Sequence, residues 1–399
     1  MEFNEAVKIL SDKVNKVDKE NVSIDSLFGR ILAEDLISKE DVPSFNRSPL
    51  DGYCFNYEDT LDANENNPSI LDVIEVVPCG KVATKKIGKM QAIKVLTGAK
   101  IPEGGNAVVK FEDVEENDGK IKIFDKFEKN QNLILSGEDV KKGTVLAKVG
   151  DVIDAGVVGL AASLGISSLC VYRKVKVGFI STGSEVLELD DKMVDGKIYN
   201  SNRYIFDAIF KKNNIDYKYY GVVDDDEDNT VKIFERAIAA CDIVISTGGV
   251  SVGDYDLVAS SLEKIGLNIF VDRIEMKPGM ACCFAEKNQK FVLALSGNPM
   301  SSVTTFYAVC LPAIRKMMGY GKYENQYFKV KLKNSFSKRI NNIRFLRGKL
   351  SIENGEAVVD LNLDQGNIVI KSLIDCNAMI KAENVKEAKA GMSFDCMLL

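Results

Sequence analysis

Three stretches of the chain pair a short apolar run with a tight loop of Gly, Ser and Thr and then a helix-like segment. They are residues 175–186 (VKVGFISTGSEV), 243–256 (IVISTGGVSVGDYD) and 291–300 (FVLALSGNPM). Glycines let a backbone approach a ligand closely, and the free N–H groups and the dipole at a helix start favour an anion. Three such junctions predict one parallel sheet that presents a phosphate-rich ligand site at the carboxyl ends of its strands.

The second loop gives the strongest of the three signals, because glycines and hydroxyl groups are concentrated in it. The residues that we expect to bind the ligand here are Thr247, Gly248, Gly249, Ser251 and Gly253. Asp256 follows at the start of the next helix, where its carboxylate could hold Mg²⁺ or orient a water. A tight turn with Asp256 as an N-cap is the alternative, and the number of glycines and hydroxyls favours the ligand site.

The first and third loops carry the same design with fewer glycines. In the first loop we expect Ser181, Thr182 and Gly183 to contact the ligand. Glu185 either holds a metal there or simply complements the helix dipole. The third loop supplies Ser296, Gly297, Asn298 and Pro299. Proline is common in a first helical turn, so plain helix initiation explains this segment equally well.

Charged residues and turns elsewhere add weaker signals. The acidic run at residues 224–228 (DDDED) favours a solvated face or a helix cap, although one or two of its aspartates at a strand end could be functional. Lys277 lies in a KPG turn, where it is either exposed or a phosphate contact. The segments RSPLDGY, with Asp51, and TGAKIP, with Thr97, are typical of plain turns.

The chain contains no histidine, which limits the chemistry that it can perform. Ser-His-Asp triads, Cys-His pairs and histidine-ligated metals are excluded. Carboxylates, hydroxyls, lysines, arginines and backbone amides remain, and this inventory fits Mg²⁺ acting on phosphates. The nine cysteines include no CxxC pair, so we expect neither a zinc site nor a disulfide framework.

Size and composition indicate a multidomain globular protein of the cytoplasm. With 399 residues, the chain is long enough for two to four domains. Its 46% hydrophobic and 28% charged residues are typical of soluble proteins. A formal net charge of −6 and the lack of a basic stripe argue against duplex nucleic acid as a partner. No apolar run approaches the length of a membrane span, and the first residues lack a signal-peptide pattern.

Alternating strand and helix patterns across residues 173–320 predict a doubly wound α/β domain. The expected strands are residues 175–180, 216–223, 243–246, 268–273 and 291–295, and the expected helices are residues 201–212, 230–240, 256–265 and 301–318. Each of the three loops follows one of these strands, so this domain is expected to carry the ligand site.

Three further parts complete the expected organisation. They are an N-terminal domain (residues 1–41 and 139–172), an inserted β-rich domain (42–138) and a C-terminal β domain (321–399). A helix over residues 155–164 is expected to pack back on an N-terminal helix over residues 2–14. This packing would make the β-rich part an insertion.

Taken together, these motifs resemble those of one family, the molybdopterin molybdenumtransferases, which include the bacterial MoeA proteins and the E domain of gephyrin. In chain order the matching segments are GRILAEDL, DVPSFNRSPLDGY, TGAKIPEGGNAVVKFED, VKVGFISTGSEV, IYNSNRYIF, GVVDDD, STGGVSVGDYD, MKPGM, LSGNPMSSVTTF and FLRG. Each segment is weak evidence alone, and their common order along the whole chain makes the resemblance specific.

The resemblance implies a cytoplasmic homodimer with an elongated, four-part subunit, in which the N-terminal part is the elongated domain. It also implies that the protein inserts molybdate into adenylylated molybdopterin and releases AMP in a Mg²⁺-dependent reaction. It implies an active site between the α/β domain of one subunit and the β-rich domain of the other, with other proteins of molybdenum cofactor biosynthesis as further partners. The family's functional positions match Asp51, Thr97, Glu185, Asp225, Asp256, Lys277 and the loop 296–299, and the expected metal ligands are Glu185, Asp225 and Asp256. Whether Asp225 or a neighbouring aspartate, Asp224 or Asp226, takes that position stays open.

Two positions depart from the family's pattern. Ser296 stands where members commonly have proline, and Met280 stands where they often have lysine after KPG. The second change removes one positive charge from an anion site. Lys277, Arg344 and Arg347 remain as cations able to bind molybdate and pyrophosphate.

Three alternatives stay open. An enzyme that adenylylates molybdopterin with ATP would have a similar α/β domain, but such enzymes usually lack the N-terminal and C-terminal domains. A dimeric scaffold that binds a partner peptide is the non-enzymatic alternative, which the intact set of acids disfavours. Tungstate could take the place of molybdate, because the two oxyanions are nearly identical.

Overall fold

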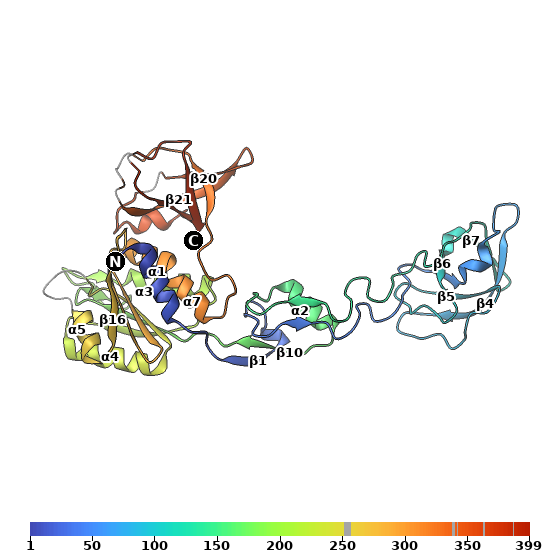
Figure 1. The fold of residues 1–399 in the computed structure, drawn as a ribbon, viewed down its shortest axis with the longest axis horizontal. Helices are drawn as coiled ribbons and strands as arrows, with labels where there is room; N and C mark the ends of the chain where they lie inside the picture. Colours follow the sequence, from blue (N-terminus) through green and yellow to red (C-terminus); the bar gives the residue numbers. More distant parts are fainter. Residues whose placement is uncertain (251–256, 337–339, 341, 362–363, 386) are drawn as a thin grey trace.

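The molecule is long and carries different sheets at its two ends (Figure 1). The computed structural model describes residues 1–399 except 251–256, 337–339, 341, 362–363 and 386. An α/β body and the C-terminal strands form one end, a β-rich sheet forms the other, and a narrow arm joins them. None of the helices in the described ranges is long and apolar enough to cross a lipid bilayer. The expected domain boundaries after residues 41, 138, 172 and 320 stay predictions.

The α/β body is built on a six-stranded sheet. In spatial order its strands are β14 (Tyr217–Val223), β11 (Val177–Thr182), β15 (Ile243–Thr247), β19 (Lys290–Leu295), β18 (Ala281–Lys287) and β16 (Asn268–Arg273). The first four run parallel, whereas β18 is antiparallel to both of its neighbours. The strands that precede the three predicted loops, β11, β15 and β19, therefore lie parallel in one sheet as the sequence predicts, and β18 is an antiparallel strand that the sequence analysis did not expect. β18 and β19 form a hairpin across Asn288 and Gln289, whose φ angles of 52° and 62° suit a tight two-residue turn.

Helices cover both faces of this sheet, which is the doubly wound arrangement that the sequence predicts. They are α1 (Phe3–Lys13), α3 (Ser201–Lys212), α4 (Glu227–Ala240), α5 (Leu257–Lys264), α6 (Pro299–Thr305) and α7 (Leu311–Met317), with a π-helical turn (Phe306–Cys310) between the last two. Successive residues of a strand point to opposite faces. Phe179 of β11 accordingly lies in a core with Phe206 of α3, and Ile180 lies in a second core with Phe234 of α4.

Two short antiparallel pairs and one helix form the arm. β1 (Lys19–Ser23) pairs with β10 (Ser168–Tyr172), β2 (Leu36–Ile37) pairs with β9 (Val145–Ala147), and the helix is α2 (Ala155–Ser163). The arm has a small core of its own, which comprises Leu27, Leu32, Leu36, Ala147, Ile153, Ala161 and Val171. Ala161 of α2 is buried in this core, so the helix covers the strands of the arm.

The expected packing of this arm helix on the N-terminal helix is wrong. Phe3, Ala6 and Leu10 form one buried stripe of α1, and this stripe belongs to the core of the α/β body. The ring of Phe3 also lies 5.4 Å from the ring of Phe345 in the C-terminal strands, measured between centroids. The strand pair β1–β10, rather than a pair of helices, therefore carries the chain out of the body and back.

The far end of the molecule is a second six-stranded sheet, inserted in the chain between β2 and β9 (Figure 1). Its strands in spatial order are β6 (Ala107–Lys110), β3 (Gly52–Phe55), β5 (Gln91–Val95), β4 (Ser69–Val77), β8 (Lys120–Ile123) and β7 (Val114–Asn117). Tyr53 and Phe55 pack into a core on one face, and Cys54 packs into a core on the other. The predicted β-rich insertion is therefore present as one sheet with two covered faces.

The C-terminal strands close into a small barrel. Around it run β21 (Ile343–Glu353), β22 (Glu356–Asp360), β20 (Phe328–Leu332), β24 (Ser393–Leu398) and β23 (Ala378–Ala382), and β23 pairs with β21 to complete the ring. β17 (Met276–Lys277), from the α/β region, pairs with β21 and ties the barrel to the body. Short 3₁₀ helices occur at Ile24–Ser26, Tyr57–Thr60, Phe111–Asp113 and Ile370–Leu373.

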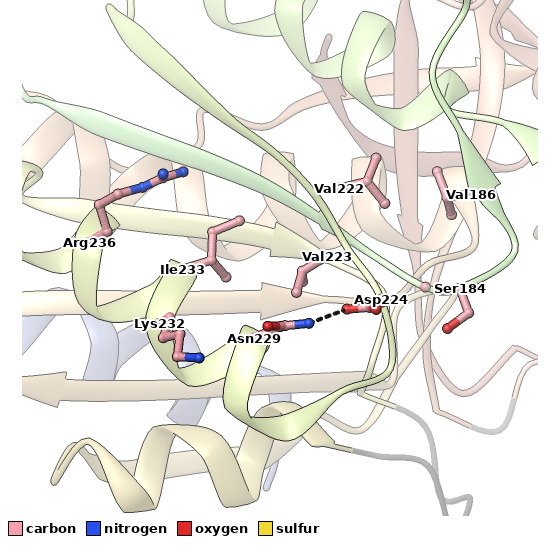
Figure 2. Close-up of a pocket in the computed structure, with 10 residues that line it drawn as sticks. Ser184, Val186, Val222, Val223, Asp224, Asn229, Lys232, Ile233 and Arg236 are labelled. Atoms are coloured by element: carbon pink, nitrogen blue, oxygen red, sulfur yellow. Dashed lines mark hydrogen bonds between the residues drawn. The ribbon is translucent and has the colours of Figure 1, made fainter. Parts of the chain in front are cut away.

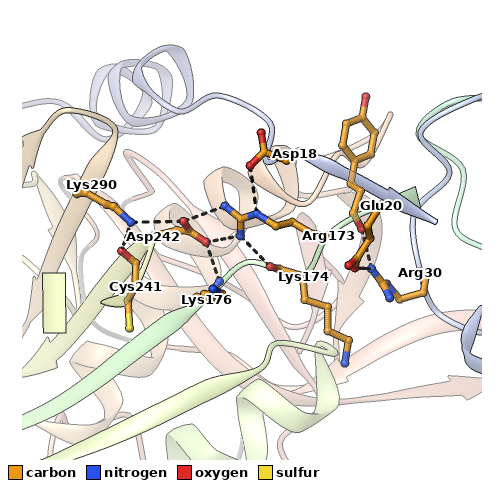
Figure 3. Close-up of polar contacts among 10 residues, drawn as sticks. Asp18, Glu20, Arg30, Arg173, Lys174, Lys176, Cys241, Asp242 and Lys290 are labelled. Atoms are coloured by element: carbon orange, nitrogen blue, oxygen red, sulfur yellow. Dashed lines mark hydrogen bonds and ion pairs between the residues drawn. The ribbon is translucent and has the colours of Figure 1, made fainter. Parts of the chain in front are cut away.

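An ion-pair network joins the arm to the body where β11 and β15 begin (Figure 3). Arg173, which follows β10, donates two hydrogen bonds to Asp242 at 2.7 and 3.0 Å. The backbone N–H of Lys176 donates to the same carboxylate at 2.9 Å, and the Lys290 ammonium lies 3.7 Å from it. Burial opposes ionisation of Asp242, but these contacts more than offset it and hold the pKa of Asp242 below its ordinary value. We call this set the Arg173–Asp242 latch.

Candidate active site

The three predicted loops leave the sheet side by side. β11 lies between β14 and β15, and its residue Ser181 pairs with Thr247 of β15. Thr247 in turn pairs with Leu295, the last residue of β19. Because these strands are parallel, their carboxyl ends meet at one edge of the sheet. The structure thus brings the three loops together, as the sequence predicts.

A cavity of about 700 Å³, here named the central cavity, lies over this edge. Its volume is in the range typical of sites for small organic ligands. The predicted site residues that line it are Ser181, Thr182, Gly183, Glu185, Asp225, Thr247, Gly248, Gly249, Ser296, Gly297, Asn298 and Pro299. Ser251, Gly253 and Asp256 lie outside the described residues, so their roles stay predictions.

Gly248 and Gly249 allow two of the loops to touch. Their φ angles of 102° and 63° lie in the region that favours glycine. A Cβ atom on Gly248 would lie 2.4 Å from the carbonyl oxygen of Thr182, and one on Gly249 would lie 2.7 Å from a methyl of Val258. The Thr182 hydroxyl donates to the carbonyl of Thr247 at 3.3 Å. Close packing of the loops therefore requires these glycines, in addition to any approach by a ligand.

The three aspartates that follow β14 have different surroundings. Asp226 caps α4, because its carboxylate accepts from the backbone N–H of Asn229 at 2.8 Å. Asp224 accepts from the side chain of Asn229 at 3.2 Å and lines a separate cavity of about 600 Å³ on the α4 side, which Figure 2 shows. All three aspartates are described, and only Asp225 lines the central cavity. The geometry therefore favours Asp225 over its neighbours.

A reciprocal contact holds Asp225 near Glu185. The Asp225 carboxylate accepts from the backbone N–H of Ser184 at 3.1 Å, and the Asp225 N–H donates to the Ser184 hydroxyl at 3.0 Å. Glu185 comes next in the chain and lines the same cavity. Mg²⁺ commonly combines one or two carboxylates with phosphate oxygens and waters, so this donor set fits the ion. Within the described part of the chain, no group of three His, Cys, Asp or Glu side chains could hold a metal, and the fit rests on these two carboxylates together with a phosphate.

A smaller cavity of about 300 Å³ adjoins the central cavity, with which it shares Ala281, Ser296 and Asn298. We name it the cation-lined cavity, because Lys277 and Arg344 line it. These two residues are neighbours because β17 pairs with β21 in the register that sets Lys277 opposite Arg344. Two cations at one small cavity favour an oxyanion as the ligand.

Arg347, the second arginine that the sequence suggests for anion binding, has a different position. Its side chain is only 1% exposed, and it donates to the Ser372 hydroxyl and to the carbonyls of Asp364 and Gly366, each at 3.0 Å. Burial lowers the pKa of Arg347. Arg347 is not among the described residues that line the two cavities, but it holds the segment that leads to Ile368 at the central cavity. No local sequence pattern marks that contribution from the barrel.

Asp51 and Thr97 form a pair far from this site. Asp51 precedes β3 and Thr97 follows β5, in the sheet at the opposite end of the molecule (Figure 1). Thr97 donates its backbone N–H at 2.6 Å and its hydroxyl at 2.9 Å to the Asp51 carboxylate. These hydrogen bonds, the backbone one first, lower the pKa of Asp51. Neither residue is among the described residues that line the central cavity.

The sequence reasoning missed a fourth group of residues at the cavity, the start of α3. Asn200, Ser201 and Asn202 all line the central cavity. Asn200 caps α3 by accepting from the backbone N–H of Arg203 at 3.1 Å. The Asn202 amide donates to the carbonyl of Gly297 at 2.8 Å and so joins α3 to the third loop. Asparagine directly before a helix pattern was the available signal.

Two protein families match the chain in succession. Residues 1–165 match the MoeA N-terminal region (domain I and II), and residues 178–316 match a probable molybdopterin binding domain. A molybdopterin molybdenumtransferase of Staphylococcus epidermidis is 34% identical over 396 residues, which cover 99% of this chain and 94% of the relative. The chain belongs to the molybdopterin molybdenumtransferase family. A family member from Staphylococcus aureus is 32% identical with the same coverage.

Solved structures of MoeA proteins share the whole fold. Two from Pyrococcus horikoshii match with TM-scores of 0.87 and 0.85, at 30% and 33% sequence identity. The matches cover 100% of this chain, and 98% and 100% of the two solved chains. The fold of a molybdopterin molybdenumtransferase, which the sequence predicts, is therefore confirmed from the arm to the barrel.

Proposed function

We propose that the protein acts in molybdenum cofactor biosynthesis by inserting molybdate into adenylylated molybdopterin with release of AMP. The observation that carries this proposal is the pairing of two cavities, one at the ends of three parallel strands with two carboxylates, and one lined by two cations. The names of the relatives indicate the substrate class. The two adjoining cavities offer one place for each substrate.

The central cavity is the proposed site of the adenylate. Its pyrophosphate link is anionic, and the loops after β11, β15 and β19 offer backbone N–H groups and hydroxyls to it. The first turn of α3 adds N–H groups that have no partner within the helix. These donors are fixed before the ligand arrives, because the loops contact one another through Thr182 and Gly248.

Mg²⁺ belongs to the proposal, with Glu185 and Asp225 as the residues that would hold it. When bound, the ion supplies charge neutralisation on the phosphates and polarises the bond to AMP. The contribution of the chain is to keep the Asp225 carboxylate at the cavity wall, which it does through the reciprocal hydrogen bonds to Ser184. Asp256 remains the third predicted ligand.

The cation-lined cavity is the proposed site of molybdate. Lys277 and Arg344 would bind the oxyanion, and Arg344 suits it because a guanidinium offers two parallel donors. Ser296 and Asn298 line both cavities, so an oxyanion held here lies next to the ligand of the central cavity. Binding of the two substrates side by side lowers the entropy cost of their reaction.

A homodimer with a shared active site is the fourth part of the proposal. Asp51 and Thr97 are expected to act in catalysis, yet they lie at the far end of their own subunit, so they would reach the cavity of a partner (Figure 1). The segment between β12 (Val186–Leu187) and α3 gives further support, because it carries large exposed hydrophobic side chains, of which Ile198 and Tyr199 line the cavity. The exposed side chains are Leu189, Met193, Val194, Ile198 and Tyr199, with exposed fractions between 39% and 58%. Such a surface suits contact with a second copy of the chain.

The direct test is an assay of AMP release from adenylylated molybdopterin. We expect release that depends on both molybdate and Mg²⁺, and a parallel reaction with tungstate measures the choice of metal. A reaction with ATP and molybdopterin in the absence of molybdate tests the preceding adenylylation step. Turnover only in that second reaction would overturn the proposal, and inactivity in both would favour a scaffold.

The shared site can be tested by complementation of two inactive variants. Asp51→Asn keeps an oxygen for the N–H of Thr97 but removes the charge, and Glu185→Gln removes one carboxylate from the central cavity. In a heterodimer with a shared site, one active site carries both lesions and the other carries neither. We therefore expect up to half of the wild-type activity to return. No recovery in verified heterodimers would place both residues in the same subunit's site.

A further inference from the structure

A second polar network lies behind the wall of the central cavity, around Glu188. We infer that Glu188 is a positioning residue of this site: its carboxylate fixes Asn200, and through Asn200 it fixes the Ser181 hydroxyl and the first turn of α3. This inference rests on the proposed binding of an adenylate at the central cavity. Glu188 is not among the described residues that line the cavity, so it would act only through the groups that it holds.

Three side chains converge on this carboxylate. Glu188 directly follows β12, and its Oε1 accepts from the Tyr219 hydroxyl at 2.5 Å and from the Asn200 amide at 3.3 Å. Its Oε2 accepts from Arg203 at 2.5 Å. Burial opposes ionisation of Glu188, but the hydrogen bonds from Tyr219 and Arg203 more than offset it and lower its pKa. The carboxylate is therefore charged near neutral pH and can only accept hydrogen bonds.

Asn200 links this carboxylate to the cavity. Its side chain is buried, and its oxygen accepts from the backbone N–H of Arg203 at 3.1 Å as the cap of α3. Its nitrogen then faces three acceptors, Ser181 Oγ and Tyr219 Oη at 3.0 Å each and Glu188 Oε1 at 3.3 Å, which share its two hydrogens. Glu188 therefore contributes to the orientation of the amide, directly through this contact and indirectly through the Tyr219 hydroxyl that it accepts from. Loss of the Glu188 carboxylate would therefore weaken the position of the Asn200 amide, which both caps α3 and contacts the Ser181 hydroxyl.

Arg203 provides a second contact between Glu188 and α3, the helix that Asn200 caps. Its guanidinium pairs with Glu188 and lies 4.3 Å from the centroid of the Tyr219 ring. An exposed ion pair alone would contribute little. This pair differs because the network ends at Ser181 and at the first turn of α3, which both line the central cavity. Its expected effect is therefore on the affinity for an anion at that turn.

The test compares Glu188→Gln with wild type in the full-length protein. Glutamine keeps the shape but turns an N–H toward Arg203 or Tyr219, both of which are donors. We expect the dissociation constant for adenylylated molybdopterin, measured by calorimetry, to rise about tenfold. The KM for molybdate should not change, because β17 and β21 build the cation-lined cavity. Glu235→Gln, at an exposed position of α4, is the matched control and should bind like wild type.

The possible results separate failure of the inference about Glu188 from failure of the proposed function. Unchanged affinity in a folded Glu188→Gln protein would overturn the inference, and so would an equal loss for molybdate, which indicates general damage. If Glu188→Gln does not fold, Tyr219→Phe replaces it. That change removes the hydroxyl that donates to Glu188 and accepts from Asn200, and a loss of about threefold is expected. Unchanged affinity there would refute the role as well. A wild-type protein that does not bind adenylylated molybdopterin would instead overturn the proposed function, and this inference with it.

Discussion

Removal of one partner of the Arg173–Asp242 latch should destabilise the protein more than removal of both. Asp242→Leu deletes the acceptor of two Arg173 hydrogen bonds and of the Lys176 N–H. The side chains of Asp242 and Arg173 are only 11% and 26% exposed, so the remaining guanidinium would be largely cut off from water. Asp242→Leu combined with Arg173→Met removes both members of the buried ion pair, whereas the Lys290 ammonium and the exposed Asp18 carboxylate keep their charges.

The magnitude follows from this burial. Removal of one member of a buried ion pair costs roughly 3–5 kcal/mol, and the partial exposure of Arg173 points to the lower end, about 3 kcal/mol. In the double variant the main loss is the unpaired N–H of Lys176, about 1–2 kcal/mol. The double variant is therefore expected to regain roughly 1–2 kcal/mol relative to Asp242→Leu.

Native-state hydrogen exchange of the β11 and β15 amides is the suitable assay. The protein has several sheets and no tryptophan, so a single two-state unfolding curve would not isolate this region. Exchange in β11 and β15 should be fastest in Asp242→Leu, intermediate in the double variant and slowest in wild type. If the double variant exchanged as fast as the single one, or if the two substitutions were additive, the latch would not be a coupled ion pair.

Charge removal at the two cavities and acid titration of the latch give the remaining predictions. Glu185→Gln and Asp225→Asn should each slow AMP release more than tenfold at limiting Mg²⁺, a barrier increase above ~1.4 kcal/mol, whereas Asp224→Asn on the neighbouring residue should leave the rate unchanged. Arg344→Gln should raise the KM for molybdate while calorimetry finds the same affinity for the adenylate; a loss of both would refute a separate oxyanion site. Acid titration followed by circular dichroism should show that the ionised latch stabilises the folded protein and that this stabilisation is lost in acid. Because the folded pKa of Asp242 is lowered, its stabilisation is complete above the ordinary value of 3.8 and is lost as pH falls through the folded pKa, so wild type should lose more stability in that window than the double latch variant.

The loop with Gly248 and Gly249 shows which structural features the sequence predicts and which it does not. Adjacent glycines between an apolar run and a helix pattern correctly predict a tight junction at a strand end. The pattern does not reveal that a side chain on Gly249 would meet Val258 of α5, because helix packing depends on the whole fold. Substitution of Gly249 by valine would therefore disturb packing as well as binding, which is why charge-removing variants are the sharper tests.

The misplaced elements have a common physical cause. β18 and β17 were missed, because four consecutive buried residues in β18 show no alternation and β17 has only two residues. The stripe on α1 correctly indicates a buried helix, but an apolar stripe does not specify its partner, and α1 packs on the body rather than on α2. Local patterns thus predict elements and their loops, whereas contacts between distant parts of the chain need the structure.

The latch and the cavity lie at opposite ends of the same strands. β11 and β15 begin next to Arg173 and Asp242, and they end at Thr182 and Thr247 on the central cavity. The arm that carries the β-rich sheet enters the body at the latch (Figure 3). If the β-rich sheet supplies Asp51 to a partner's cavity, the latch sets the direction of the arm that carries this sheet. The latch is attached to β11 and β15, the strands that build the subunit's own cavity. Asp242→Leu should then reduce the rate of AMP release, although no latch residue lines either cavity. The affinity of the central cavity for the adenylate, measured by calorimetry, should not change.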